Sequence, residues 1–221
     1  MIKKICNQYY LSVEGETEKW YFEHLQELIN SSEEIPFKVN FDIKINKSII
    51  SRAKSISAIY SIKAFHICDY ESNDKVHKLQ FARVLEELKN VKKINRKINY
   101  KLGYSNFSFD LWIILHKKQQ KSAVSHRKQY VKGINKAFNE NFQFIDDYKE
   151  ERNFKRILKQ ITLEDVISAV NNANEIRRMN EENLKCNYRK YGQFEYYTEN
   201  PDMTINECIE QILEECGAIK K

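Results

Sequence analysis

The chain has 221 residues, of which 42 % are hydrophobic and 31 % are charged, and its formal net charge is +6. This apolar content is enough for a folded core and excludes a chain that is disordered throughout. Only 5 glycines and 2 prolines occur, which excludes long flexible linkers. No stretch approaches the ~18 apolar residues of a membrane span, and the basic excess is compatible with a polyanionic partner.

The five cysteines are widely spaced and odd in number, and no C-x-x-C motif occurs. We therefore expect reduced thiols rather than a disulfide framework or a zinc ribbon. The apolar run near the N-terminus reaches Glu14 too soon to be the hydrophobic region of a signal peptide. The sequence predicts a cytoplasmic protein without a membrane anchor.

The first half of the sequence alternates between strand-like and helix-like patterns. β-rich or alternating apolar residues predict strands, and apolar residues at a helical period predict helices between them. In chain order, the expected elements are a strand at 9–13, a helix at 17–29, a strand at 37–45, a helix at 50–60, a strand at 64–68, a helix at 75–91 and a strand at 98–102.

The second half shows only helical periods. The apolar segment 107–116 predicts a buried helix that follows a possible N-cap at Ser105 and Asn106, and the last helix is expected at 204–216. The predicted fold class is α/β, with a mainly parallel sheet flanked by helices and a helical C-terminal extension. We expect an α/β core at 1–120 and a helical region at 121–221 packed on it, as one compact unit.

Carboxylates follow two of the predicted strands. Glu14, Glu16 and Glu18 come after the first strand, and Asp69 and Glu71 come after a later one. The carboxyl ends of parallel strands share one edge of a sheet, which is where open α/β folds bind ligands. Carboxylate oxygens are ligands that Mg²⁺ and Mn²⁺ prefer. The sequence therefore predicts a Mg²⁺ or Mn²⁺ site at this edge.

Three segments resemble known families. The stretch EGETEKWYF, followed some fifty residues later by DYE, resembles the Toprim domain of topoisomerases, primases and OLD-family nucleases. Together with SNFSFDLWIILH and NPDMTINECIEQIL, it resembles the RloB-like family of bacterial defence proteins, which is related to Toprim nucleases. The resemblance implies a Toprim-like α/β fold and spans nearly the whole chain in the right order.

The resemblance assigns roles residue by residue. Glu14 matches the Toprim glutamate, and Asp69 matches the first acid of the Asp-x-Asp pair, whose second acid is Glu71 here. Phe107 and Asp110 stand where the family usually has Pro and Glu. The resemblance implies a metal-dependent nuclease that cuts DNA or RNA as an effector of antiphage defence, with an ATPase partner of the ABC or SMC-like type. It leaves a homo-oligomer open.

Further roles are expected from the residues themselves. Glu18 would be a fourth metal ligand, and Lys101, near the end of a predicted strand, would supply a catalytic cation beside Glu14, Asp69 and Glu71. The residues expected to contact a nucleic-acid backbone, in DNA or tRNA, are Ser105, Asn106, Lys117, Lys118, Arg127 and Lys128. Such basic runs are also typical of solvated faces. Trp112 and His66 are expected in the core, and Asp74 as a helix N-cap.

Two other functions remain open at this point. In one of them, the acids organise a loop of a non-catalytic module that binds nucleic acid or a partner. A doubly wound phosphatase acting on small molecules is disfavoured, because such enzymes commonly place a nucleophilic Asp where this chain has Glu14.

Overall fold

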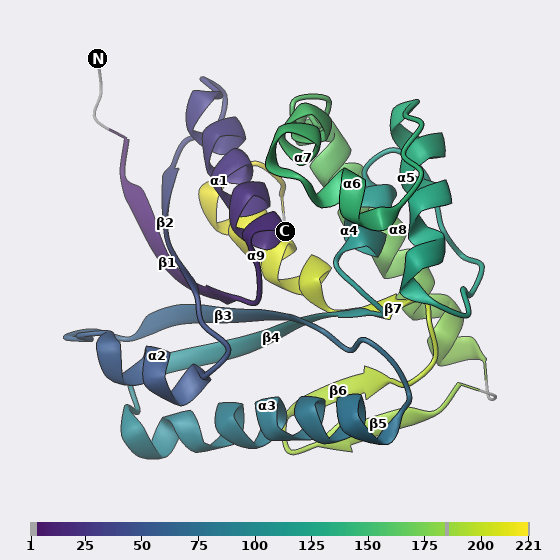
Figure 1. The fold of residues 1–221 in the computed structure, drawn as a ribbon. Helices are drawn as coiled ribbons and strands as arrows, with labels where there is room; N and C mark the ends of the chain where they lie inside the picture. Colours follow the sequence, from purple (N-terminus) through teal and green to yellow (C-terminus); the bar gives the residue numbers. More distant parts are fainter. Residues whose placement is uncertain (1–3, 184–185, 221) are drawn as a thin grey trace.

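The computed structural model describes residues 4–183 and 186–220 and builds them around one five-stranded sheet (Figure 1). The strand order is β2-β1-β3-β4-β7, in which the first four strands are parallel and β7 is antiparallel to the end of β4. The strands are β1 (Cys6–Val13), β2 (Lys38–Ile45), β3 (Ile62–Asp69), β4 (Ile98–Asn106) and β7 (Asp202–Met203). The predicted α/β fold with a mostly parallel sheet is confirmed.

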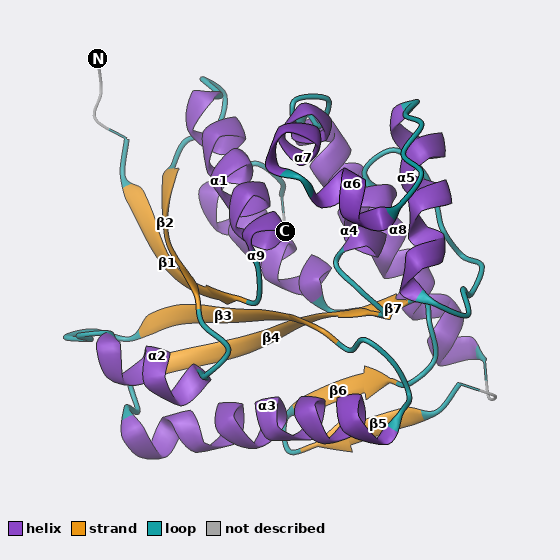
Figure 2. Ribbon diagram, in the orientation of Figure 1, coloured by secondary structure: helices purple, strands orange, loops and turns teal. Residues whose placement is uncertain are grey.

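Helices cover both faces of the sheet (Figure 2). One face carries α2 (Ile49–Ser55) and α3 (Lys75–Ile94), together with the hairpin of β5 (Tyr188–Tyr191) and β6 (Phe194–Tyr197). The helical elements associated with the other face are α1 (Glu16–Ser31), α4 (Asp110–Leu115), a short 3₁₀ turn (Arg127–Gln129), α5 (Tyr130–Phe138), α6 (Ile145–Lys149), α7 (Glu151–Leu158), α8 (Leu163–Glu182) and α9 (Ile205–Cys216). Within the described residues, no helix is long and apolar enough to cross a membrane.

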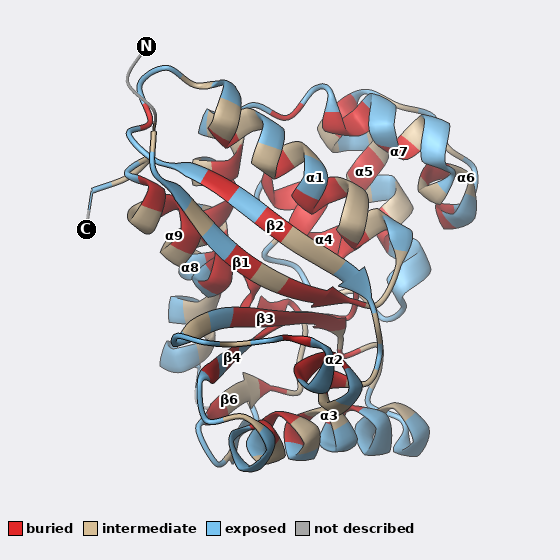
Figure 3. Ribbon diagram, turned by 90° about the vertical axis from the view of Figure 1, so that its left-hand side faces the viewer, coloured by how far each residue is buried: buried red, intermediate tan, exposed pale blue. Residues whose placement is uncertain are grey.

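Strand β3 lies in the middle of the sheet and is buried over most of its length (Figure 3). Successive side chains of a strand point to opposite faces. Phe65 and Ile67 accordingly pack into the core with α1 and α9, whereas Ala64 and Cys68 pack into the core with α2 and α3. This burial on both faces fits the continuous apolar run that predicted the strand.

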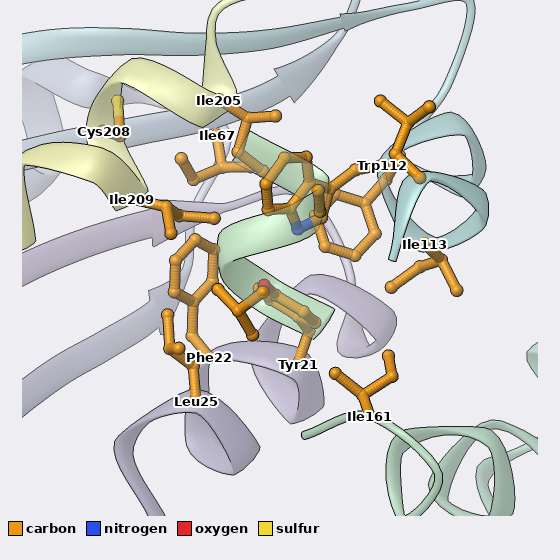
Figure 4. Close-up of a cluster of buried hydrophobic side chains, with 14 of the residues drawn as sticks. Tyr21, Phe22, Leu25, Ile67, Trp112, Ile113, Ile161, Ile205, Cys208 and Ile209 are labelled. Carbon is orange, nitrogen blue, oxygen red and sulfur yellow. The ribbon is translucent and has the colours of Figure 1, made fainter. Parts of the chain in front are cut away.

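The larger core is centred on Trp112, which is fully buried, as predicted (Figure 4). The ring of Tyr21 on α1 meets the indole edge-on at 6.2 Å between centroids. His116, at the C-terminal end of α4, is also buried, and its Nε2 lies 3.1 Å from the Tyr21 hydroxyl. His66 is buried without a hydrogen-bond partner, so both histidines belong to the interior.

The prediction of a purely helical second half is wrong. Residues 188–197 form a β-hairpin that turns at Gly192, whose φ is +61°, and β7 adds two further residues to the main sheet. Strands of two to four residues are too short to give a recognisable alternation. The hairpin aromatics pack against α3 and β4.

The region around Gly103 also differs from the prediction. Strand β4 does not close at Gly103 but continues to Asn106, so Ser105 and Asn106 are strand residues rather than an N-cap. A Cβ at Gly103 would lie 2.7 Å from Ile67 Cδ1 and 3.3 Å from Ile205 Cα. Gly103 is therefore needed for α9 to pack closely on the sheet, and helix α4 begins only at Asp110.

Residues from both predicted parts, 1–120 and 121–221, contribute to the larger core. Phe22 and Trp112 from the first part are buried in it with Ile157 and Ile209 from the second. All five cysteines are free thiols.

Candidate metal and phosphate site

The first carboxylates of the site stand where β1 passes into α1. Glu14 directly follows the buried end of β1, and Gly15 is the N-cap of α1. Glu18, in the first turn of that helix, is buried, with 6 % of its surface exposed. A Cβ on Gly15 would lie 3.0 Å from Glu18 Oε2, so the glycine leaves room for this carboxylate at the sheet edge.

Asp69 reaches the same edge from the end of β3. Because β1 and β3 are parallel neighbours, with Val13 opposite Ile67, the residues that follow them meet. The Asp69 amide donates a hydrogen bond to Glu14 Oε2 at 3.1 Å. Asp69 Oδ1 in turn accepts a hydrogen bond from the Phe109 amide at 2.8 Å. The predicted meeting of Glu14 and Asp69 is thus present.

A cation reaches these carboxylates from the C-terminal half of the chain. Lys149, the last residue of α6, is half-buried, and its Nζ lies 3.1 Å from Asp110 Oδ2. Asp110 is buried at the start of α4 and also accepts a hydrogen bond of 2.7 Å from the Ser108 hydroxyl. The charge of Lys149 acts on Asp69 and Glu18 as well. We call Glu14, Glu18, Asp69, Asp110 and Lys149 the carboxylate cluster.

Burial raises the pKa of three acids in the carboxylate cluster. For Asp69 the pKa lies well above its usual value, first because of burial and then because of the Glu18 carboxylate nearby. Burial likewise raises the pKa of Glu14 and of Glu18. For Lys149, burial lowers the pKa, but Asp110 and Asp69 outweigh it and the net shift is upward. Such mutual repulsion among buried carboxylates is relieved by a bound cation.

Glu71 is close to the cluster but turned to other partners. Its backbone is left-handed, with φ +61°, and its amide donates to the Phe107 carbonyl at 2.9 Å. Its Oε2 lies 2.6 Å from His77 Nε2, and its Oε1 lies 3.7 Å from Arg127 Nη1. Glu71 nevertheless lines a hollow of about 300 Å³ together with Glu14 and Asp69. We call this space the carboxylate hollow.

Two basic side chains line the carboxylate hollow beside its acids. Lys47 and Arg83 contribute to its wall, and the charge of Lys47 lowers the pKa of Glu14. A neighbouring hollow of about 280 Å³ is lined by Arg127 and Lys128, and it shares Glu71 with the first. Two of the predicted phosphate contacts, Arg127 and Lys128, are therefore beside the carboxylates.

Lys101 lies elsewhere. It is four residues before Ser105, the β4 residue that pairs with Asp69, which is about 13 Å along a strand. Its side chain lines a different hollow, together with Arg177 and Glu207. The cation that the structure brings to the carboxylates is Lys149.

The remaining predicted contacts are also placed apart from the two hollows. Ser105 and Asn106 are buried, and the Asn106 amide donates to the carbonyls of Tyr197 and Glu199, so neither side chain faces outward. Lys117 pairs with Asp165 at 2.5 Å near the start of α8. Lys118 follows it, beyond the end of α4.

Sequence reasoning missed Lys149 and left Asp110 without a role. Asp110 had a signal, since it stands where the resembling family has a glutamate. Lys149 had no such signal in the sequence, because it is one lysine among many. It lies in the cluster through the packing of α6, 80 residues after Asp69.

Within residues 4–183 and 186–220, no three Asp, Glu, His or Cys side chains form a ready-made metal cage. The donor set nevertheless fits a hard divalent cation, because Glu14, Glu18 and Asp69 offer carboxylate oxygens at one sheet edge and repel one another there. Asp74 is not part of this set, since its carboxylate caps α3 through the amides of Val76 and His77, as predicted.

Comparisons with known proteins gave one match. No curated protein and no solved structure matches the chain. The family model described as RloB-like protein matches residues 9–212, which is most of the sequence. The matched region includes every residue of the carboxylate cluster, and on this evidence the chain belongs to the RloB-like protein family.

Proposed function

We propose that the protein is a divalent-metal-dependent nuclease that cleaves phosphodiester bonds in DNA or RNA. The observation that carries the proposal is the meeting of Glu14 and Asp69 at the ends of two adjacent parallel strands, joined by a hydrogen bond and open to a hollow. Carboxylates at this edge, with Lys47 and Arg83 in the wall of the same hollow, suit a metal ion and a phosphate together.

Each acid of the carboxylate cluster has a distinct role in this proposal. Glu14 and Asp69 hold Mg²⁺ or Mn²⁺, and Glu18 adds a third carboxylate from the first turn of α1. When bound, the metal activates water and stabilises the negative charge that develops on the phosphate. Glu71 completes the set when its carboxylate leaves His77 and Arg127 and turns into the carboxylate hollow that it already lines.

The cations divide into two groups. Lys149 lies inside the cluster, where it offsets the negative charge of Asp110 and Asp69. Lys47, Arg83, Arg127 and Lys128 line the two hollows and hold the phosphates on either side of the scissile bond. Such contacts are independent of base sequence and weaken as salt rises.

The family resemblance extends the proposal to the cell. The protein acts as an effector of bacterial antiphage defence under an ATPase partner of the ABC or SMC-like type. These 221 residues contain no G-x-x-x-x-G-K-[ST] motif and so do not supply the ATPase themselves. We expect overexpression of this chain alone to slow host growth, and co-expression with the partner to restore it.

Three observations favour the alternative of a non-catalytic nucleic-acid- or partner-binding module. Among the described residues no metal cage is preformed, Lys149 stands among the carboxylates, and Glu71 is paired with His77. If this arrangement persists with divalent metal present, the acids organise the loop after β3 and perform no chemistry.

A cleavage assay separates the two functions. Supercoiled plasmid and total tRNA are incubated with the protein in Mg²⁺, Mn²⁺ or EDTA, beside the double variant Glu14→Gln, Asp69→Asn. The matched control is Glu16→Gln, because Glu16 is two residues from Glu14 but exposed and paired with Lys19. The nuclease predicts metal-dependent cleavage in the wild type and the control, and none in the double variant.

Cleavage that survives in the double variant, or that is lost equally in Glu16→Gln, contradicts the assigned roles. Metal binding without cleavage by the wild type indicates that an activating partner is required. If neither metal binding nor cleavage occurs, the binding module is the better description.

A further inference from the structure

A further hollow, of about 380 Å³, lies between the loop after β3 and the β5–β6 hairpin. We call it the hairpin hollow. Tyr70 and Phe81 line both this space and the carboxylate hollow, so the two are neighbours separated by these rings. In Figure 1 the hairpin lies beside the N-terminal part of α3, next to the loop that follows Asp69.

The hairpin hollow carries an excess of positive charge, because two cations and one carboxylate line it. Lys78 and Arg189 line it, and neither has a carboxylate partner among the described residues. The hollow also contains Glu199, but both oxygens of this carboxylate are engaged by Asn187, at 2.7 Å from its amide N and 2.5 Å from Nδ2. Asn187 is neutral, so the Glu199 carboxylate keeps its charge, and an anionic ligand meets two cations against one carboxylate here.

Aromatic rings form the inner side of the hairpin hollow. Phe81 meets Tyr70 edge-on at 5.0 Å between centroids, and it meets Tyr196 edge-on at 5.1 Å. Tyr70 and Phe81 are buried, with 2 % and 3 % of their surface exposed, whereas Tyr196 is only partly buried and is the ring of the three that a base can reach. Aromatic rings beside Arg and Lys are the combination with which proteins hold the bases and phosphates of single strands.

The walls of the hairpin hollow are joined to the loop after β3, which follows Asp69. Asn73 Nδ2 donates to the Thr198 carbonyl at 2.8 Å, which links the loop after β3 to the strand end of β6. The Tyr70 hydroxyl donates to Asn73 Oδ1 at 3.0 Å. Because Tyr70 directly follows Asp69, the position of the hollow relative to the carboxylates is fixed by neighbouring residues and two hydrogen bonds.

We infer that the hairpin hollow binds one unpaired nucleotide of a strand whose adjacent phosphate lies in the carboxylate hollow. The inference rests on the proposed nuclease function and names its substrate class as single-stranded or looped nucleic acid. The volume suits one ligand of nucleotide size. In a duplex the bases are stacked inside the helix and cannot enter without being flipped out, which costs free energy.

Binding measured in EDTA tests this inference without requiring cleavage. Fluorescence anisotropy gives the Kd of labelled single-stranded DNA and RNA 12-mers and of a duplex of the same sequence, at one fixed salt concentration. The test variant is Arg189→Glu. The matched control is Lys190→Glu, the next residue of β5, which is equally exposed, changes the charge by the same amount and pairs with Glu195 outside the hairpin hollow.

The inference predicts that the wild type binds a single strand about tenfold more tightly than the duplex, and that Arg189→Glu weakens single-strand binding about tenfold. The Kd of Lys190→Glu for the single strand should stay within about twofold of the wild-type value, because salt screens a surface charge that does not contact the ligand. Thermal melts of both variants check that they fold.

Three outcomes overturn the inference: equal weakening by the two variants, equal affinity for single strand and duplex, or no single-strand binding by the wild type. The two proposals fail separately. Selective single-strand binding with neither metal binding nor cleavage supports the inference about the hairpin hollow and counts against the nuclease. Metal-dependent cleavage by the wild type, with single-strand binding unaffected in Arg189→Glu, supports the nuclease and rejects nucleotide binding in the hairpin hollow.

Discussion

Two buried groups of charged side chains differ in how completely their charges are satisfied. Asp202, at β7, is fully buried, and its carboxylate accepts hydrogen bonds from the Tyr104 hydroxyl, Arg177 Nη1 at 3.0 Å, the Tyr197 amide at 3.2 Å and Asn180 Nδ2 at 3.1 Å. Each oxygen has a donor, and no hollow described above is lined by Asp202.

The carboxylate cluster has the opposite balance. Its four acids, Glu14, Glu18, Asp69 and Asp110, outnumber its one cation, Lys149, which pairs with Asp110, and Glu14 and Asp69 face a hollow. Burial raises the pKa of Asp202 and of Asp69 alike, well above the usual value. A raised pKa therefore does not separate the two groups. Unbalanced charge next to an open space does, and it identifies the cluster as the functional candidate.

The substitution Asp202→Ala should have the largest effect, a loss in the free energy of unfolding. Replacement by Ala leaves Arg177 and the Tyr104 hydroxyl without their buried acceptor, and removal of one partner of such a pair costs about 3–5 kcal/mol. Urea unfolding measures the loss. An unchanged unfolding midpoint would show that Asp202 is not the structural group that its four contacts indicate.

Lys149→Gln should have the next largest effect. In EDTA the variant leaves the buried acids without a cation, and we expect it to be about 1–3 kcal/mol less stable than the wild type. Added Mn²⁺ should restore more stability to the variant than to the wild type. The control is Lys155→Gln, an exposed lysine paired with Glu151, which should lose less. Equal losses would mean that the cluster is not short of positive charge.

The pH dependence of stability should distinguish Asp69 from an ordinary surface acid. Because its pKa is raised in the folded state, the folded protein binds this proton more tightly than the unfolded chain. The resulting stabilisation is present below the unfolded pKa, about 4, and is lost as pH rises through the folded value. Asp69→Asn, compared with wild type in EDTA, should flatten this decline. Parallel pH curves would contradict the assignment.

The smallest expected change in stability is at Gly15. Its backbone is extended, so Ala is sterically tolerated and the free energy of unfolding should change by less than about 1 kcal/mol. The added Cβ would press on Glu18 Oε2 at 3.0 Å and displace this carboxylate. We expect cleavage to fall several-fold while the melting temperature is nearly kept. Full activity in Gly15→Ala would argue that Glu18 does not hold metal.

The sequence predicted the part of the site that depends on local pattern. Glu14 and Asp69 each follow a strand with a clear apolar run, and parallel strands bring such residues together. The sheet and the long helices follow from the same periodicities. Elements without enough residues to show a period, such as β7 and the β5–β6 hairpin, were not predictable in this way.

The cation of the site was predicted wrongly in position for a related reason. Lys101 stands at the end of the predicted strand 98–102, but β4 continues past Gly103 to Asn106 and leaves Lys101 before the strand end. Lys149 reaches the cluster only through the packing of α6 against the rest of the core. Long-range packing of this kind has no signature in local sequence.

Mn²⁺ titration by calorimetry, at neutral pH, tests the central claim most directly. The proteins compared are the wild type, Asp69→Asn and Asp202→Asn. Asp69→Asn removes one carboxylate from the carboxylate cluster, and Asp202→Asn removes the buried carboxylate whose oxygens already have hydrogen-bond donors. The account predicts that the wild type and Asp202→Asn bind Mn²⁺, provided that the latter remains folded by circular dichroism, and that Asp69→Asn loses this binding. Undiminished binding by Asp69→Asn would contradict the claim that the carboxylate cluster is the metal site.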